Sequence, residues 1–262
     1  MHPFLFDGWV YGHHLKIPSF GVFLAIAFST AYFLSLRNAL RLGVPLRHIE
    51  NLFLLIILAS AIGARLFHVV FEDFSYYLAQ PLKILAVWEG GFTFYGSFIA
   101  SILTLIVYCR TYSVPVGLVF DLAGVSTALS LSIGRIGCFA AGCCWGKVCH
   151  FPWAVTFTHP EAFNSVAGVP VHPTQLYESL GAFLIFIWAQ KKLLKPHVPG
   201  TVGLMILLSS SLVRFCVEWF RGDTYRGFII PEWLSYSQLI SLGLAASALL
   251  AFRWLKINQR SI

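Results

Sequence analysis

Charged residues are scarce in this sequence. They make up 11% of 262 residues, against 58% hydrophobic and 16% aromatic, whereas soluble domains carry about 25% charged residues. So low a content excludes an ordinary soluble globular protein. The composition instead predicts an all-α polytopic membrane protein, with residues 1–262 forming a single integral membrane domain and little chain left for a soluble one.

The N-terminal stretch MHPFLFDGWVYGHHLKIPSFG also lacks the features of a secretory signal peptide. It has no basic start, no continuous apolar run and no small-residue cleavage site. We therefore expect the chain from Ile17 onward to be retained as the first membrane span.

Long apolar runs are abundant. About 20 apolar residues cross a bilayer core of roughly 30 Å, and seven segments meet this length, at about 18–37, 50–71, 92–110, 115–133, 174–190, 201–220 and 234–253. The longest connection, at about 134–173, is rich in Gly, Pro, His and Cys. Connections of this length in a compact domain are usually either functional or disordered.

The distribution of charge predicts the orientation. Lys and Arg accumulate in short cytoplasmic loops, and ten of the eighteen fall on one side: Arg37, Arg41, Arg47, Arg110, Lys191, Lys192, Lys195, Arg253, Lys256 and Arg260. The other side collects Asp7, Glu72, Asp73, Glu89, Glu161, Asp223 and Glu232. This predicts an outer N-terminus, a cytoplasmic C-terminus and an outward-facing 134–173 segment. Anchoring to anionic headgroups explains the net charge of +7 without a nucleic-acid partner.

Arginines stand at the ends of two apolar runs. SIGRIGCFAAGCCWGK contains Arg135, and SSSLVRFCVEWFRGD contains Arg214, Glu218 and Arg221. An arginine at membrane depth is costly, so it usually faces a cavity and meets an anion. The planar guanidinium suits phosphate, and a lipid phosphate is therefore the predicted ligand.

Two further stretches place polar groups at the start of a span. PLKILAVWEGGFTFYGSFIAS sets Tyr95 about one turn inside the third span, and VHPTQLYESLGAFLIF sets Tyr177 and Glu178 at the start of the fifth. Gln175 and Glu178 are three residues apart and so share a helix face. Interfacial anchoring by the tyrosines and helix capping explain the same residues without chemistry.

Four of the six cysteines lie in the outer segment, spaced C-x4-C-C-x4-C: Cys138, Cys143, Cys144 and Cys149. This spacing does not match the common zinc patterns, so no metal site and no cofactor are predicted. Three interpretations stay open. The cysteines form disulfides in an oxidising envelope space, one is a reactive thiolate whose pKa is lowered by Arg135, or they pack as small inert residues.

Taken together, the motifs resemble those of the bacterial phosphatidylglycerol–prolipoprotein diacylglyceryl transferases. GRIGCFAAGCCWG is similar to that family's signature G-R-[IL]-G-N-F-[IL]-N-G-E-x-[WY]-G, with Gly142 and Gly146 among the matches. WEGGFTFYGSFIA, HPTQLYES, RFCVEWFRGD and the GARLF around Arg65 resemble four more family elements, in the same order.

The resemblance implies a seven-span protein of the bacterial inner membrane. It would transfer the diacylglyceryl group of phosphatidylglycerol to the thiol of a lipobox cysteine in the signal peptide of a preprolipoprotein, releasing glycerol phosphate. Other membrane lipids would surround it. The implied catalytic residues are Tyr95, Arg135, Arg214 and Glu218, and the implied substrate-binding residues are Arg135, Arg214, Arg221, Gly142, Gly146 and Tyr177.

This sequence departs from the family pattern where the acceptor thiol needs a base. Tyr95 stands where the family commonly has a histidine, Cys138 and Ala141 replace its signature asparagines, and Cys143 replaces its signature glutamate. Tyr95 is the first choice for the base and Cys143 its rival. A second class of function is a diverged lipid-binding membrane protein whose outer cysteines act in thiol redox chemistry or assembly, and a third is transport.

Overall fold

The computed structural model describes residues 3–10, 13–86, 88, 90–159, 168–222, 227–230 and 233–259. Of the charged residues used to orient the chain, Glu89, Glu161, Asp223, Glu232 and Arg260 lie outside these ranges. The chain divides into two compact units, one made of Met1–Leu34 with Asp121–Ile262 and the other of Ser35–Phe120.

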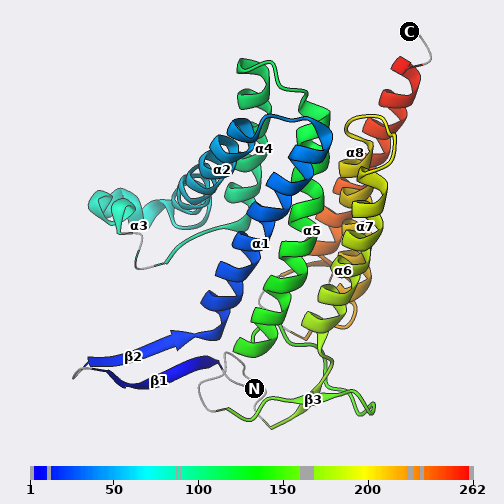
Figure 1. Ribbon diagram of the computed structural model, residues 1–262. Coiled ribbons are helices and arrows are strands. Elements are labelled where there is room, and N and C mark those ends of the chain that lie inside the picture. The colour runs from blue at the N-terminus through cyan, green and yellow to red at the C-terminus, as the bar shows by residue number, and fades with distance from the viewer. Residues whose placement is uncertain are drawn as a thin grey trace. The chain divides into compact units, whose positions relative to one another are not determined.

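Long helices account for every segment expected to span the membrane: α1 (Ser19–Leu42), α2 (Leu46–Phe67), α4 (Phe94–Thr111), α5 (Val116–Ala141), α6 (Thr174–Leu193), α7 (Thr201–Glu218) and α8 (Tyr236–Gln259) (Figure 1). A π-helical turn, η1 (His68–Glu72), continues α2. Five helices are long and apolar enough to cross a bilayer, namely α1, α2 with its extension, α5, α7 and α8. The described chain is therefore a mostly helical, polytopic membrane protein.

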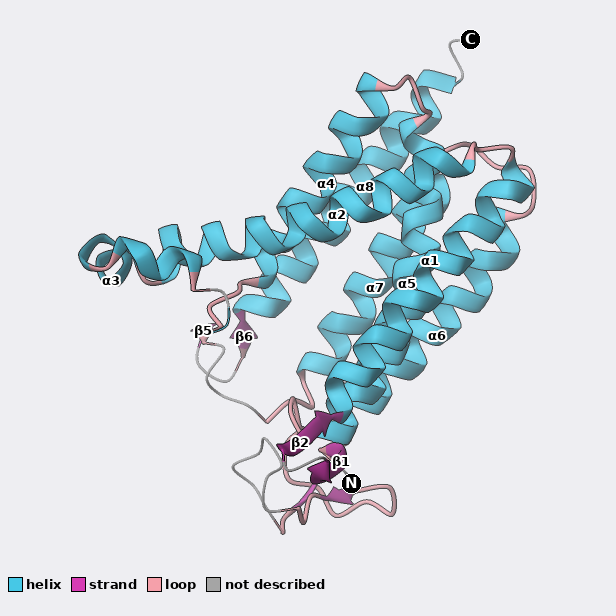
Figure 2. Cartoon of the chain, turned by 60° about the vertical axis from the view of Figure 1, so that its left-hand side comes forward, coloured by secondary structure: helices cyan, strands magenta, loops and turns pink. Residues whose placement is uncertain are grey.

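Three short two-stranded antiparallel sheets, which the sequence analysis did not expect, accompany the helices (Figure 2). They pair β1 (Phe4–Val10) with β2 (His13–Pro18), β3 (Val155–Thr156) with β4 (Pro170–Val171), and β5 (Phe228–Ile230) with β6 (Leu234–Ser235). In the first, Asp7 pairs with Lys16 across the strands, and its carboxylate also lies 3.0 Å from His14 Nε2. The sequence analysis looked for apolar runs of about 20 residues, and strands as short as these do not appear in such a search.

In the Ser35–Phe120 unit, α2 and α4 pack through small residues. A Cβ on Gly63 would lie 2.6 Å from the carbonyl oxygen of Gly96, so neither helix tolerates a side chain there. Arg65, at the end of α2, donates to the carbonyls of Lys83 (2.6 Å) and Ile84 (3.0 Å) in the 3₁₀ helix η2 (Pro81–Leu85). Arg65 therefore holds the connection between α2 and α4, which also contains the short helix α3 (Phe74–Ala79).

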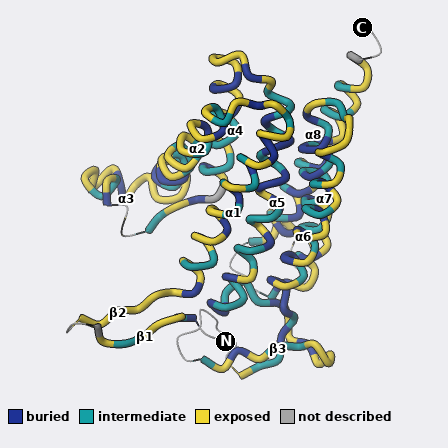
Figure 3. The backbone as a smooth tube through the Cα atoms, viewed as in Figure 1, coloured by how far each residue is buried: buried dark blue, intermediate teal, exposed yellow. Residues whose placement is uncertain are grey.

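In the other unit, the Asp121–Ala141 part of α5 runs beside α6 and α7 (Figure 1). Asp121 is fully buried and accepts hydrogen bonds from the backbone N–H groups of Gly200 (2.7 Å) and Gly203 (2.6 Å), which satisfies the N-terminus of α7. Gly181 of α6 packs directly on Val213 of α7. Exposed positions recur along these helices (Figure 3), as expected for helices that face lipid.

The helix α5 extends beyond the expected end of its span at about 133. It continues to Ala141, so Arg135 and Cys138 are helical. Gly137 lets α5 approach α1 closely, since a Cβ there would lie 2.8 Å from the Cβ of Phe23. The helix ends at Gly142, whose positive φ of 78° suits a helix C-terminus.

Candidate functional site

A carboxylate surrounded by three guanidinium groups forms the centre of the candidate site. Glu178, on the first turns of α6, is 6% exposed at its side chain, and its Oε2 lies 2.5 Å from Arg135 Nε of α5. Its Oε1 accepts a hydrogen bond from Arg214 Nη1 of α7 and lies 3.8 Å from Arg221 Nη1. The structure therefore brings together the three arginines that the sequence predicted. Glu178, which the sequence analysis did not include among the site residues, joins them.

Glu178 could have been found from the sequence. It is an acidic residue near the start of an apolar helix and shares a face with Gln175, and an ionisable group in that position usually has a charged partner. The missing step was to pair it with the arginines, which are 43 and 36 residues away in the chain.

The position of Arg214 is determined by other partners as well. Its Nη2 lies 2.8 Å from Glu218 Oε2, one turn along α7, and its Nε donates to Ser237 Oγ at 3.0 Å. Glu218 also accepts a hydrogen bond of 3.0 Å from Ser235 Oγ. These contacts fix the plane and the direction of the Arg214 guanidinium.

A cavity of about 50 Å³ adjoins this cluster. Arg135, Glu178 and Arg214 line it together with apolar side chains of the same helices. A volume of this size holds only one or two water molecules. The guanidinium groups are therefore paired with Glu178 here, and the cavity beside them is too small for a lipid headgroup.

The signature loop that follows α5 is attached to the ends of α6 and α7. Gln175 Nε2 donates to the carbonyl of Cys143 (2.5 Å), and Thr174 Oγ1 donates to that of Cys144 (2.8 Å). Gly146 forms an isolated antiparallel bridge with Arg221. The loop thereby connects the two helices that carry Glu178 and Arg214.

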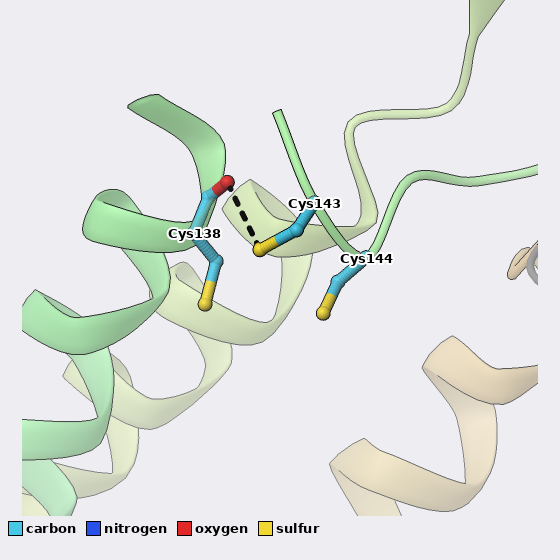
Figure 4. Close-up of side chains that lie close together, drawn as sticks. All are labelled: Cys138, Cys143 and Cys144. Carbon is cyan, nitrogen blue, oxygen red and sulfur yellow. Dashed lines mark hydrogen bonds between the residues drawn. The ribbon is translucent and has the colours of Figure 1, made fainter. Parts of the chain in front are cut away.

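Three sulfur atoms converge at the start of this loop. The Sγ atoms of Cys138, Cys143 and Cys144 all lie within 4.8 Å of one another (Figure 4). All three are free thiols of intermediate exposure. Cys149 is buried and does not join them, and its backbone N–H donates to the carbonyl of Pro170.

The thiols next to the arginines differ in acidity. Hydrogen bonds from Cys138 and Cys143, together with the positive charge of Arg221, lower the pKa of Cys144. Hydrogen bonds with Cys138 and Cys144, together with burial, raise the pKa of Cys143. One thiolate beside Arg221 is therefore favoured over two, because like charges so close repel each other.

Gly146 has a structural reason to be glycine. A Cβ at this position would lie 2.5 Å from both the Cβ and the carbonyl oxygen of His172, and 2.7 Å from the carbonyl oxygen of Phe220. We expect Gly146→Ala to separate the loop from the ends of α6 and α7, lowering the midpoint of thermal unfolding by several degrees. Differential scanning fluorimetry of the purified protein measures this change.

Gly243→Ala is the matched control for that prediction. Gly243 lies in α8 with no atom near the position of an added Cβ, so alanine there should be neutral or slightly stabilising. Equal unfolding temperatures for the two variants would show that the loop adapts to a side chain at Gly146.

The two predicted tyrosines lie in different surroundings. Tyr177 is half-buried on α6, and its hydroxyl lies 3.1 Å from His172 Nδ1, so it joins the group that positions the loop. Tyr95 belongs to the Ser35–Phe120 unit and is 40% exposed, with its ring 6.3 Å from that of Phe67. The substrate-binding role of Tyr177 and the catalytic role of Tyr95 stay predictions.

The apolar helices define a class, a polytopic membrane protein, and this one carries a buried carboxylate in contact with three arginines. Residues 9–254 match the family model described as prolipoprotein diacylglyceryl transferase. A phosphatidylglycerol–prolipoprotein diacylglyceryl transferase of Coxiella burnetii is 35% identical over 249 residues, covering 92% of this chain and 91% of that protein. One of Solidesulfovibrio magneticus is 33% identical over 235 residues, covering 87% and 86%.

The chain belongs to the prolipoprotein diacylglyceryl transferase family. The match spans both compact units, so the membership applies to nearly the whole chain and not to one part of it. The resemblance noted in the sequence is confirmed. The chain is accordingly a membrane-bound transferase of lipoprotein biosynthesis.

Proposed function

We propose that this protein transfers the diacylglyceryl group of phosphatidylglycerol to the thiol of a lipobox cysteine in a preprolipoprotein, with release of glycerol phosphate. The observation that carries the proposal is the convergence of Arg135, Arg214 and Arg221 on Glu178, within a chain that matches this family over most of its length. Three guanidinium groups facing two carboxylates, Glu178 and Glu218, leave one positive charge for an anion.

In this proposal, Arg135 and Arg214 bind the phosphate of the lipid and stabilise the charge that develops on the departing glycerol phosphate. The leaving oxygen already belongs to a phosphate, so cationic groups directed at it can supply much of the reduction in the barrier. Arg221 and Glu218 orient them, and Gly142, Gly146 and Tyr177 shape the binding site. Tyr95 accepts the proton of the acceptor thiol. No nucleic acid takes part.

A direct assay tests the proposed activity. The protein, reconstituted in vesicles that contain phosphatidylglycerol, should release glycerol phosphate only when a peptide with a lipobox cysteine is added. The peptide should gain the mass of a diacylglyceryl group. A peptide with serine in place of the cysteine is the control, and release without transfer would indicate a lipase instead.

The second candidate function rests on the three clustered sulfurs. A diverged lipid-binding protein with a thiol-redox or assembly role would oxidise and reduce Cys138, Cys143 or Cys144 while leaving the lipid intact. Thiol cycling without any release of glycerol phosphate in the same vesicles would favour that function. Restored growth of a bacterium depleted of its own transferase would favour the first.

The proposed topology has seven spans in the bacterial inner membrane, an outer N-terminus, a cytoplasmic C-terminus and an outer 134–173 segment, all in one integral membrane domain. It predicts that an impermeant thiol reagent labels Cys144 in reduced, intact cells and does not label a cysteine introduced at Arg41. Cys144 is the better target, because Cys149 is buried. The reverse labelling pattern would invert the orientation.

A further inference from the structure

The cysteine loop has an unusual backbone that directs its sulfurs to one place. Cys144 has a positive φ of 60°, a conformation that is uncommon outside glycine, and it follows Gly142 at 78°. The Cys143 thiol lies 3.6 Å from the carbonyl oxygen of Cys138, drawn as a dashed line in Figure 4. Unfavourable backbone conformations persist where the surrounding structure imposes them, and they cluster at functional sites. Here the conformation turns Cys143 and Cys144 back towards Cys138 on α5.

The spacing of the sulfurs suits a metal ion. Zinc forms bonds of about 2.3 Å to thiolates, which places the sulfurs of a tetrahedral site about 3.8 Å apart. The three Sγ atoms already lie within 4.8 Å of one another, so a contraction of at most about 1 Å completes three corners of the tetrahedron. Among the described residues, no fourth His, Cys, Asp or Glu joins the group. Three protein ligands with an open fourth position are the pattern of catalytic zinc sites, whereas structural sites are closed.

The charges around the loop also suit a zinc thiolate centre. Three thiolates with one Zn²⁺ carry a net charge of −1, and Arg221, which hydrogen bonds to Cys144, is the neighbouring cation. Arg135 precedes Cys138 by three residues and so lies on the same face of α5. Arg221 contacts both Cys144 and Glu178, so it joins the sulfurs to the arginine cluster.

We propose that Cys138, Cys143 and Cys144 bind a Zn²⁺ ion whose open position takes the acceptor thiol of the transfer reaction. This inference rests on the proposed function. The sequence left open whether Tyr95 or Cys143 activates the acceptor thiol. The inference assigns this activation to the metal, because a thiol that coordinates zinc is deprotonated outright. The base that takes this proton then does not have to be strong.

The step balances without oxidation or reduction. The acceptor cysteine binds zinc as a thiolate and its proton passes to a base or to water. The sulfur attacks the glycerol carbon that carries the phosphate ester. A C–S bond forms, the C–O bond breaks, and the electron pair leaves on the phosphate oxygen of glycerol phosphate, beside the arginines. Zinc stays divalent throughout.

Metal binding by the full chain in detergent provides the first test. The reduced protein should bind one Zn²⁺ in competition with a chromophoric chelator, and Cys143→Ser should weaken this binding at least about 100-fold, since a thiolate ligand is lost. Cys216→Ser is the matched control, because Cys216 is an exposed cysteine on α7 away from the cluster. Equal affinity in all three proteins, or no binding at all, overturns the proposal. The proposal is also overturned if two of the three thiols form a disulfide again while Zn²⁺ is present.

Cobalt substitution tests the open position. Co²⁺ in the site should give thiolate-to-metal charge-transfer absorption that grows when a lipobox peptide with cysteine is added, because a fourth sulfur binds. The same peptide with serine should leave the spectrum unchanged. An unchanged spectrum with both peptides means that the metal is structural and overturns the role in activation.

Activity separates this inference from the function on which it rests. Zinc-loaded protein should transfer at least 10-fold faster than zinc-free protein, with equal phosphatidylglycerol binding in both forms and an unfolding temperature that rises on zinc loading. Equal transfer rates overturn the inference and leave the proposed function standing. Binding of Zn²⁺ and of the peptide thiol, without transfer in either form, overturns the proposed function and supports the thiol site.

Discussion

Arg214→Ala is expected to weaken phosphatidylglycerol binding by about 10- to 150-fold, because charge-assisted hydrogen bonds contribute about 1.5–3 kcal/mol each. Turnover should fall further, by a factor of about 10² to 10³, since the same guanidinium stabilises charge on the leaving group. Arg135→Ala should behave alike, because both arginines contact Glu178. Binding to vesicles of graded phosphatidylglycerol content and release of glycerol phosphate measure the two effects separately.

Three further variants make this result interpretable. Arg214→Lys should recover only part of the loss, since an ammonium group cannot reproduce the planar fork that faces Glu178 and Glu218 together. Arg214→Ala also leaves the buried Glu178 with fewer partners, which destabilises the fold. Adding Glu178→Gln to Arg214→Ala should restore the unfolding temperature without restoring turnover. Arg253→Ala, an exposed arginine on α8, is the control for loss of a positive charge.

Unchanged affinity and turnover in Arg135→Ala and Arg214→Ala would show that the phosphate binds elsewhere. The cluster with Glu178 would then be a structural ion-pair network between α5, α6 and α7. Such networks also occur among buried ionisable groups, so the vesicle measurements decide between the two roles.

Tyr95→Phe should lower turnover at least about 10-fold while leaving phosphatidylglycerol binding nearly intact, since a positioned general base contributes about 10² to 10⁴. Phenylalanine keeps the ring that lies against Phe67 and removes only the hydroxyl. Tyr95→His should retain or raise activity and give an acid limb near the histidine pKa of about 6.5. The measurement is the pH dependence of transfer in reconstituted vesicles.

Tyr76→Phe is a suitable control, because Tyr76 is an exposed tyrosine of the same unit that has no proposed role. Full turnover by Tyr95→Phe would remove Tyr95 from the mechanism. If Cys143→Ser were inactive at the same time, activation would belong to the sulfur cluster alone. The zinc-binding measurements are independent of either outcome.

The amino-acid sequence by itself determined the class of this protein. Membrane spans depend on local composition, because every 20-residue apolar run has to satisfy its own backbone hydrogen bonds within one helix. The arginines could be identified in the same way, since an ionisable group at membrane depth stands out against an apolar background. The family resemblance followed from motifs that are each continuous in the chain.

The tertiary structure decided what depends on distant residues. Arg135, Glu178 and Arg214 are on three helices, and only the packing of α5, α6 and α7 brings them into contact. The close approach of Gly137 in α5 to Phe23 in α1 is likewise a contact between distant residues that no local pattern reveals. The convergence of three sulfurs depends on two positive φ angles and on hydrogen bonds from α6, so the C-x4-C-C-x4-C spacing did not predict a metal site. Here a turn with two residues of positive φ brings together sulfurs that the spacing alone does not place side by side.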